Sequence, residues 1–267
     1  MLYPEIVDSN EQYISISKAF ASDHATADLN DKPGIAVCWA ESPYPFWNAL
    51  FLTEEMNDPA HLKQRLRTSA EYMRTRKHPG LVYVCEDYLR DDAHREFSVA
   101  AQEAGLEMAL DLFGMRGDIL SFKRAESHPE LRFERVVDEE SLRTYADINS
   151  ESYGYPLEAG RVALEGSALW KERSFAYIGY LDGKAVSTAA AFENTGQLYL
   201  TYVATRPGVT RQGLAEATIR RALDAAFKAT GLRRTSLHAT RSGFSLYDRI
   251  GYKWVTRIIA FRPARAG

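Results

Sequence analysis

Residues Leu198–Ala215, Leu-Tyr-Leu-Thr-Tyr-Val-Ala-Thr-Arg-Pro-Gly-Val-Thr-Arg-Gln-Gly-Leu-Ala, join a predicted strand to a predicted helix. The apolar, aromatic and β-branched residues of Leu198–Val203 favour a β-strand, and Pro207 and Gly208 end it. The segment that follows predicts an amphipathic helix that ends at Gly231, because apolar residues recur on one face. These are Ala215, Ile219, Ala222, Leu223, Ala226 and Phe227.

The turn before this helix has the chemistry of an anion site. The first N–H groups of a helix have no internal partner and carry partial positive charge. Gly213 lets a ligand approach the backbone, and Arg206 and Arg211 add cationic donors. The residues form neither a P-loop nor a dinucleotide-binding glycine motif, which favours a diphosphate other than a magnesium nucleotide. An ordinary turn with solvated arginines is an equal alternative from the residues alone.

The rest of the second half predicts an alternation of strands and helices around this segment. A hairpin is expected at Asp182-Gly183. The predicted strands are Leu131–Val136, Phe175–Leu181, Ala185–Phe192, Thr235–Ala239 and Tyr252–Phe261. The predicted helices are Asp138–Ser152 and Ser242–Ile250, with a weaker helical stretch that reaches Trp170.

The first half predicts a similar alternation, and we expect two domains, 1–125 and 131–267, joined by the polar linker Ala125–Glu130. The helix that Asp58 and Pro59 open has an N-cap and a proline at its first position. The other expected helices are Glu11–Ala27 and Asp91–Ala104. The expected strands are Ile35–Ala40, Asn48–Leu52, Leu81–Cys85, Glu107–Met115 and Asp118–Lys123.

Composition excludes several classes of protein. The 267 residues carry a net charge of -3, with 45% hydrophobic and 26% charged residues, so we expect a globular protein rather than a duplex DNA binder. No apolar run is long enough for a transmembrane helix, and the N-terminus does not resemble a secretory signal, which favours the cytoplasm. The six histidines show no metal-ligand spacing, and we expect Cys38 and Cys85 to be buried thiols rather than a disulfide.

The segment Leu198–Ala215 resembles the acetyl-CoA-binding segment of the GNAT N-acetyltransferase superfamily. The family's glycine and glycine/alanine positions fall on Gly213 and Ala215, whereas Thr210 stands where the family has Arg or Gln. Ser242–Tyr252 is similar to a second family element, a helix with a tyrosine followed by a glycine–aromatic pair. The resemblance covers Leu131 to Phe261.

The resemblance implies a mixed-sheet α/β protein with tandem GNAT-like domains and an acyl-CoA N-acyltransferase fold in the second half. It implies acetyl-CoA as co-substrate and no metal. Val203, Ala204 and Thr205 would offer backbone groups to the pantetheine arm, and Tyr247 would protonate the departing thiolate as general acid. The N–H groups for the pyrophosphate would be those of Arg211, Gln212, Gly213, Leu214, Ala215 and Glu216.

The identity of the general base stays open. The positions where the family often has Glu or His hold Gln197 and Tyr199, and neither is a base at neutral pH. Glu193 and His238 are substitutes, although a solvated carboxylate and a structural histidine are the stronger interpretations. A proton relayed through water, or an amine of low pKa, explains the chemistry equally well.

The first half has two interpretations. One is a degenerate GNAT-like repeat that has lost cofactor binding, because the loop Glu86–Asp92 is acidic, lacks glycine and would repel a pyrophosphate. The other is an unrelated α/β domain that shapes the acceptor pocket. Tyr153 and Tyr155 are candidates for the acceptor side.

The predicted function is acetyl transfer from acetyl-CoA to an amine by direct attack. The acceptor is a small-molecule amine or a peptide amine, with neither nucleic acid nor membrane as partner, and a homodimer is an open alternative to a monomer. A catalytically silent CoA-binding sensor, and an acyltransferase that uses another acyl-CoA, are the rival functions.

Overall fold

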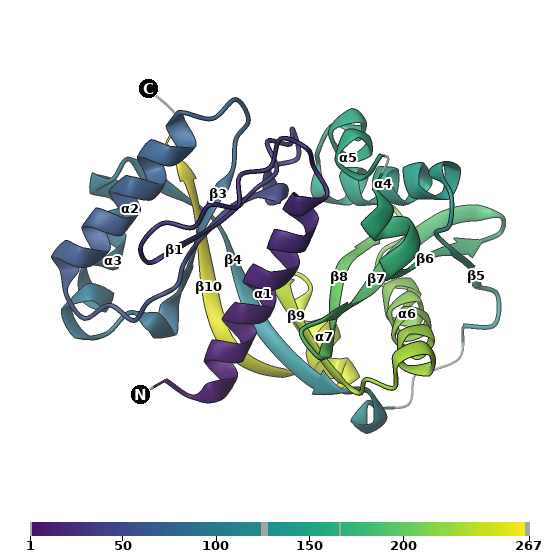
Figure 1. Ribbon diagram of the computed structural model, residues 1–267. Helices are drawn as coiled ribbons and strands as arrows, with labels where there is room; N and C mark the ends of the chain where they lie inside the picture. Colours follow the sequence, from purple (N-terminus) through teal and green to yellow (C-terminus); the bar gives the residue numbers. More distant parts are fainter. Residues whose placement is uncertain (1, 124–127, 166, 265–267) are drawn as a thin grey trace. The chain divides into compact units, whose positions relative to one another are not determined.

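The computed structural model describes residues 2–123, 128–165 and 167–264, and the chain forms two compact units (Figure 1). The first unit comprises the residues up to Gly114, His238–Phe244 and the segment from Trp254 on. The second unit comprises Met115–Leu237 and Ser245–Lys253. The units are therefore not contiguous along the chain. The predicted domains 1–125 and 131–267 stay a prediction, and part of the predicted linker, residues 125–127, lies outside the described residues.

The first unit contains a mixed sheet in the order β1-β2-β3-β10-β4. Its elements are α1 (Pro4–Ser22), β1 (Ile35–Trp39), β2 (Asn48–Leu52), α2 (Pro59–Arg74), β3 (Leu81–Cys85), α3 (Asp91–Glu103), β4 (Leu106–Asp118) and β10 (Lys253–Pro263). β1 and β2 are antiparallel, β2 and β3 are parallel, and β3 and β10 are antiparallel. The last strand of the chain thus lies beside a strand of the N-terminal half.

Two expectations for the first half are wrong. The first helix begins at Pro4 rather than Glu11 and ends at Ser22, because proline suits the first helical position, where no N–H is needed. β4 extends to Asp118, where a second strand had been expected to begin. The chain turns there because the Asp118 carboxylate accepts a hydrogen bond from the N–H of Leu120. The other two helices and the other strands lie close to their predicted positions.

Both cysteines are free thiols inside the first unit, as expected. Cys38 lies in β1 and Cys85 in β3, and both strands are buried along their length. Burial raises the pKa of the Cys38 thiol to about 12 and that of the Cys85 thiol to about 11. Both thiols are therefore protonated and pack as small apolar groups.

The second unit contains a sheet in the order β9-β8-β7-β6-β5, in which only the β8–β9 pair is parallel. Its elements are β5 (Arg132–Arg135), α4 (Glu139–Tyr153), α5 (Leu157–Leu164), β6 (Ser174–Leu181), β7 (Lys184–Asn194), β8 (Gln197–Thr205), α6 (Leu214–Thr230), β9 (Arg234–Thr240) and α7 (Phe244–Ile250). The expected hairpin is present, with Asp182 and Gly183 at positive φ between β6 and β7. The mixed α/β fold class is confirmed.

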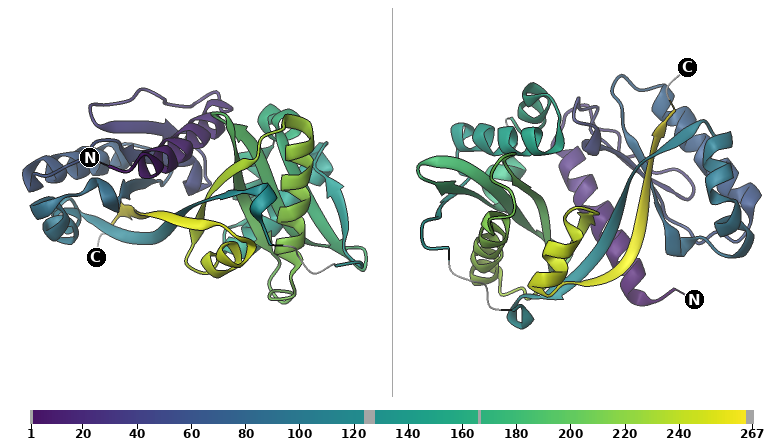
Figure 2. Two further views of the ribbon diagram at one scale, coloured as in Figure 1. Left: turned by 90° about the horizontal axis from the view of Figure 1, so that it is seen from below. Right: turned by 180° about the vertical axis from the view of Figure 1, so that it is seen from behind.

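Helices α4 and α6 cover opposite faces of the second sheet (Figure 2). Ser187 of β7 bonds Thr218 of α6, with 2.7 Å between the hydroxyl oxygens. The next residue, Thr188, accepts a hydrogen bond from Asn149 of α4 at 3.1 Å. Because successive strand residues point to opposite faces, the two helices sandwich β7. In the described residues no helix has the length and hydropathy that crossing a membrane requires.

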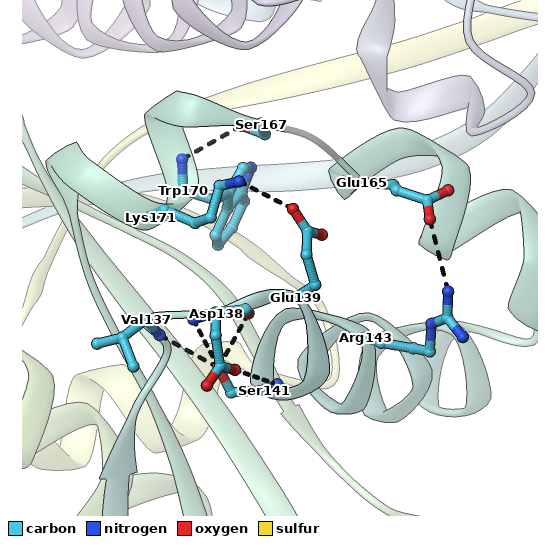
Figure 3. Close-up of polar contacts among 9 residues, drawn as sticks. All are labelled: Val137, Asp138, Glu139, Ser141, Arg143, Glu165, Ser167, Trp170 and Lys171. Atoms are coloured by element: carbon cyan, nitrogen blue, oxygen red, sulfur yellow. Dashed lines mark hydrogen bonds and ion pairs between the residues drawn. The ribbon is translucent and has the colours of Figure 1, made fainter.

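Helix α4 begins with a capping box that fixes its start (Figure 3). The Asp138 carboxylate accepts from the N–H of Ser141 at 2.8 Å, and the Ser141 hydroxyl accepts from the N–H of Asp138 at 3.2 Å. Lys171 adds an ion pair to Glu139 at 2.8 Å. The two contacts between Asp138 and Ser141 satisfy backbone N–H groups that would otherwise lack a partner. Hydrogen bonds from Ser141 lower the pKa of the Asp138 carboxyl.

We expect Asp138→Ala to lower the melting temperature by roughly 2–4 °C at pH 7, because the cap is lost. Asp138→Asn keeps a side-chain acceptor and should lie close to the wild type. Since the folded-state pKa lies below the ordinary value of 3.8, the carboxylate contributes above that pH and the contribution disappears as the pH falls. Thermal unfolding between pH 7 and pH 3 tests this, and equal melting temperatures for wild type and Asp138→Ala at pH 7 would contradict it.

Candidate functional site

β8 carries a bulge near its carboxyl end. Ala190 of β7 is opposite Thr201, but Thr188 is opposite Ala204, so two residues of β8, Tyr202 and Val203, face one of β7. Tyr202 has φ of +51°, a left-handed conformation that residues with a side chain rarely adopt. The bulge changes the direction of the backbone immediately before the residues that the sequence assigned to a ligand.

β8 and β9 separate just before this bulge. Their parallel register contains only the pairs Leu198–Thr235 and Tyr199–Ser236, although β8 continues to Thr205. Backbone groups beyond Tyr199 on this side of β8 therefore have no register partner in β9. Val203, Ala204 and Thr205, for which the family resemblance implies backbone contacts to a ligand, lie in this part of the strand.

Three side chains of α4 hold the carbonyl groups of this part of β8. The Tyr145 hydroxyl donates to the Tyr202 oxygen at 3.0 Å. The Tyr153 hydroxyl donates to the Val203 oxygen at 3.1 Å, and the Ser152 hydroxyl donates to the Thr205 oxygen at 2.8 Å. The sequence alone predicts no role for Tyr145 or Ser152. Because residues seven positions apart lie on one face of a helix, the spacing of Tyr145 and Ser152 is the sequence signal that they contact the same neighbouring strand.

The turn after β8 leads into an uncapped helix N-terminus. Gly213 is the N-cap of α6, has φ of +79° and forms no side-chain cap. The N–H groups of Leu214, Ala215 and Glu216 occupy the first turn, where a helix offers no internal acceptor. A Cβ at Gly208 would meet nothing within 4 Å, and the nearest atom to one at Gly213 is 3.9 Å away, in His128. The described residues thus leave space at this helix end.

The cationic side chains of the turn differ in what they contact. Arg206 forms an ion pair with Glu151 at 3.0 Å and is neutralised by it. Arg211 is exposed, and no ion pair of its side chain occurs within the described residues. Glu216, in the first turn of α6, pairs with Arg220 at 2.8 Å and Arg249 at 3.0 Å. The two guanidinium groups offset the negative charge that Glu216 places beside the helix N-terminus.

Tyr247 lies in α7 with only 9% of its surface exposed. Its ring packs edge-on against Tyr252, with 5.8 Å between the ring centres. Burial, with a smaller effect from Tyr153 and Tyr252, raises the pKa of the Tyr247 phenol well above 10. The phenol therefore keeps its proton at neutral pH and is chemically a donor. The Tyr252 hydroxyl forms a hydrogen bond with Thr235 at 3.1 Å.

The two candidate bases have different surroundings. His238 is half-buried in the first unit, with its ring stacked on that of Tyr13 at 4.2 Å between ring centres and its Nε2 3.3 Å from the Ser9 hydroxyl. Burial lowers the pKa of His238 to about 3, so the ring is neutral at physiological pH. Glu193 is exposed and lies in β7 opposite Leu198 of β8. Leu198 precedes Val203 by five residues along β8. Gln197 and Tyr199 are buried in β8. Among the described residues no group of three His, Cys, Asp or Glu side chains has the arrangement of a metal site.

The first unit repeats the local topology of the site with a different helix end. In both units an antiparallel pair of strands leads through a helix to a parallel strand: β1-β2-α2-β3 and β7-β8-α6-β9. The N-terminus of α2 is closed, because the Asp58 carboxylate accepts from the N–H of Ala60 at 2.9 Å. By this topology the counterpart of the Gly213 turn is Thr53–Asp58, and not the acidic loop Glu86–Asp92 that the sequence analysis compared. The predicted degenerate repeat stays a prediction.

Comparisons with known proteins agree with this geometry. Residues 142–252 match the sequence model of the acetyltransferase (GNAT) family. No curated protein matches the chain. The structure is similar to a GCN5-related N-acetyltransferase from Kribbella flavida, with a TM-score of 0.67 and 15% identity over 94% of this chain and 97% of that one.

Two further solved structures have the same fold. A conserved protein of unknown function from Staphylococcus epidermidis has a TM-score of 0.66 and 11% identity, over 94% of this chain and 100% of its own. A GCN5-related N-acetyltransferase from Sphaerobacter thermophilus has a TM-score of 0.62 and 15% identity, over 87% of this chain and 78% of its own. At these identities the likeness shows the fold alone, the acyl-CoA N-acyltransferase fold.

The family match spans α4 to Tyr252 and therefore includes the bulged strand, the glycine turn and the tyrosine of α7. The second half of the chain, over residues 142–252, is a domain of the GNAT acetyltransferase family.

Proposed function

We propose that the second unit binds acetyl-CoA and transfers its acetyl group to an amine. The observation that carries this proposal is the uncapped N-terminus of α6, which follows a strand that has separated from β9. A helix end with free N–H groups attracts a diphosphate. A strand with free backbone groups can bind the amides of a pantetheine arm in the manner of an added strand.

The proposed contacts follow from these positions. The N–H groups of Arg211 to Glu216 bind the pyrophosphate, and Gly213 lets it approach because it has no Cβ. The exposed Arg211 adds a charge beside it, in place of the family residue that Thr210 replaces. The backbone of Val203–Thr205 binds the pantetheine arm.

The proposed reaction is a single displacement. The amine nitrogen attacks the thioester carbon, a C–N bond forms, and the C–S bond breaks to release a thiolate. Tyr247 gives its proton to that thiolate, and a backbone N–H of β8 polarises the carbonyl oxygen. A proton also leaves the amine, and the surroundings of Glu193 and His238 favour its loss to water or the use of an amine of low pKa.

The acceptor is a small-molecule amine or a peptide amine. Tyr153 supports an acceptor position near β8, because its hydroxyl bonds the Val203 oxygen while 40% of the residue stays exposed. A tyrosine in that position offers an aromatic surface to an acceptor and does not supply a base at neutral pH.

Calorimetric titration with acetyl-CoA, followed by an assay of thiol release with a panel of amines, tests the proposal. Micromolar binding with amine-dependent CoA release is the expected result. Binding without release from any amine, peptides included, would instead identify a silent CoA-binding protein. Absence of binding would contradict the proposal.

We expect Gly213→Glu to abolish acetyl-CoA binding, since it places a carboxylate at the proposed pyrophosphate position. Gly213→Gln is the matched control, because both side chains carry the same strain at φ of +79° and differ in charge. Titration of both variants should show a much weaker affinity for the glutamate variant than for the glutamine variant. Equal affinities in two folded variants would remove the pyrophosphate from this turn.

We expect Tyr247→Phe to lower kcat about 100-fold with little change in the KM for acetyl-CoA, because a general acid acts in the transition state. Tyr252→Phe removes a neighbouring hydroxyl that bonds Thr235, and its kcat should stay within a few-fold of the wild type. Because the pKa of Tyr247 lies well above 10, wild-type kcat should not fall through titration of this group below pH 10. Unchanged turnover in Tyr247→Phe would exclude Tyr247 from the mechanism.

A further inference from the structure

The peptide group between Tyr202 and Val203 is held by its oxygen. Two hydroxyl groups donate to the Tyr202 carbonyl, Tyr145 Oη at 3.0 Å and Thr188 Oγ1 at 3.1 Å. A carbonyl oxygen has two lone pairs, and both have a donor here. The two donors come from different elements, helix α4 and strand β7, so together they fix the direction in which this carbonyl points.

The two donors are themselves fixed. Asn149 Nδ2 donates to Thr188 Oγ1 at 3.1 Å and to the Tyr145 carbonyl at 2.9 Å. With its oxygen accepting from Asn149, the Thr188 hydroxyl has its hydrogen free for Tyr202. The Tyr145 ring is fully buried against Trp170, whose ring also packs edge-on against Tyr202 at 4.9 Å.

This arrangement maintains a backbone conformation that is unfavourable by itself. Tyr202 has φ of +51°, which brings Cβ close to the backbone in any residue other than glycine. Such strain persists only where the surroundings determine the conformation, and it gathers at functional positions. Here the surroundings are the two hydroxyl donors and the ring of Trp170.

The direction of the carbonyl decides the direction of an N–H group. The structure contains no cis peptide bond among the described residues, and in a trans peptide the C=O and the following N–H point in opposite directions. Since the Tyr202 oxygen points toward donors on α4 and β7, the N–H of Val203 points away from both. β8 lies between β7 and β9, so this N–H faces the side from which β9 has separated.

We propose that Tyr145 is a positioning residue for acetyl transfer, which rests on the function proposed above. Its hydroxyl orients the Tyr202–Val203 peptide so that the Val203 N–H meets the thioester carbonyl oxygen, on which negative charge develops during attack. Tyr145 touches neither substrate. A hydrogen bond to the oxygen of a peptide also polarises that peptide and strengthens its N–H as a donor.

Two variants test the proposal, and each removes one hydrogen bond to the Tyr202 carbonyl. Tyr145→Phe and Thr188→Val each remove one donor, and each should lower kcat about tenfold, the effect of one neutral hydrogen bond, with the KM for acetyl-CoA within twofold of the wild type. Tyr180→Phe is the matched control, because Tyr180 lies in β6 near the other edge of the sheet, where Glu134 raises the pKa of its phenol, and kcat of this variant should not change. A merely structural effect would lower the melting temperature and leave kcat per folded molecule unchanged.

The infrared band of the acetyl carbonyl gives a second readout. Acetyl-CoA labelled with ¹³C at this carbonyl should show a lower stretching frequency bound to the wild type than free in solution. In Tyr145→Phe and Thr188→Val the bound frequency should move back toward the free value. If the wild type is active and both variants keep its frequency and its kcat, the positioning role of Tyr145 is overturned and the proposed function stands. A wild type that does not bind acetyl-CoA would overturn both proposals.

Discussion

The bulge of β8 is the constraint on which the second unit depends. A strand inside a sheet normally uses the polar groups on both of its edges, because unpaired groups are costly when buried. β8 keeps its pairing with β7, gives up β9 after Tyr199, and inserts one extra residue at Tyr202 and Val203. Helix α4 supports this altered strand, since hydroxyl groups of its side chains donate to the carbonyls of Tyr202, Val203 and Thr205. The capping box begins the helix whose hydroxyl groups contact that strand, and the glycine turn follows the strand and leads into α6.

The strand, turn and helix of Leu198–Ala215 could be predicted because their causes are local. Strand residues, a proline–glycine break and an apolar face every three to four residues act within a few positions of one another. The bulge could not be predicted, because Tyr202 adopts a positive φ only through partners 57 and 14 residues away in the sequence. The role of Tyr145 depends on the same long-range contact. The position of β10 beside β3 is likewise decided by the assembly of the sheet and not by the composition of either strand.

The N-termini of α2 and α6 differ in whether a side chain of the chain itself caps the free N–H groups. α2 and α6 both follow a strand that lies between an antiparallel and a parallel neighbour. At α2 the chain supplies its own carboxylate, Asp58, to the free N–H groups. At α6 the residue in that position is Gly213, which has no side chain to accept from those N–H groups. One side chain thus decides whether the positive end of the helix is available.

The place of β10 in the first sheet governs the order in which the protein is completed during synthesis. β10 stands between β3 and β4, so most of the first unit leaves the ribosome long before this inner strand does. The edges of β3 and β4 stay open until residues 253–263 emerge, and open edges invite pairing with other chains. A ribosome that stops before Lys253 therefore releases a chain in which β3 and β4 lack the strand that lies between them.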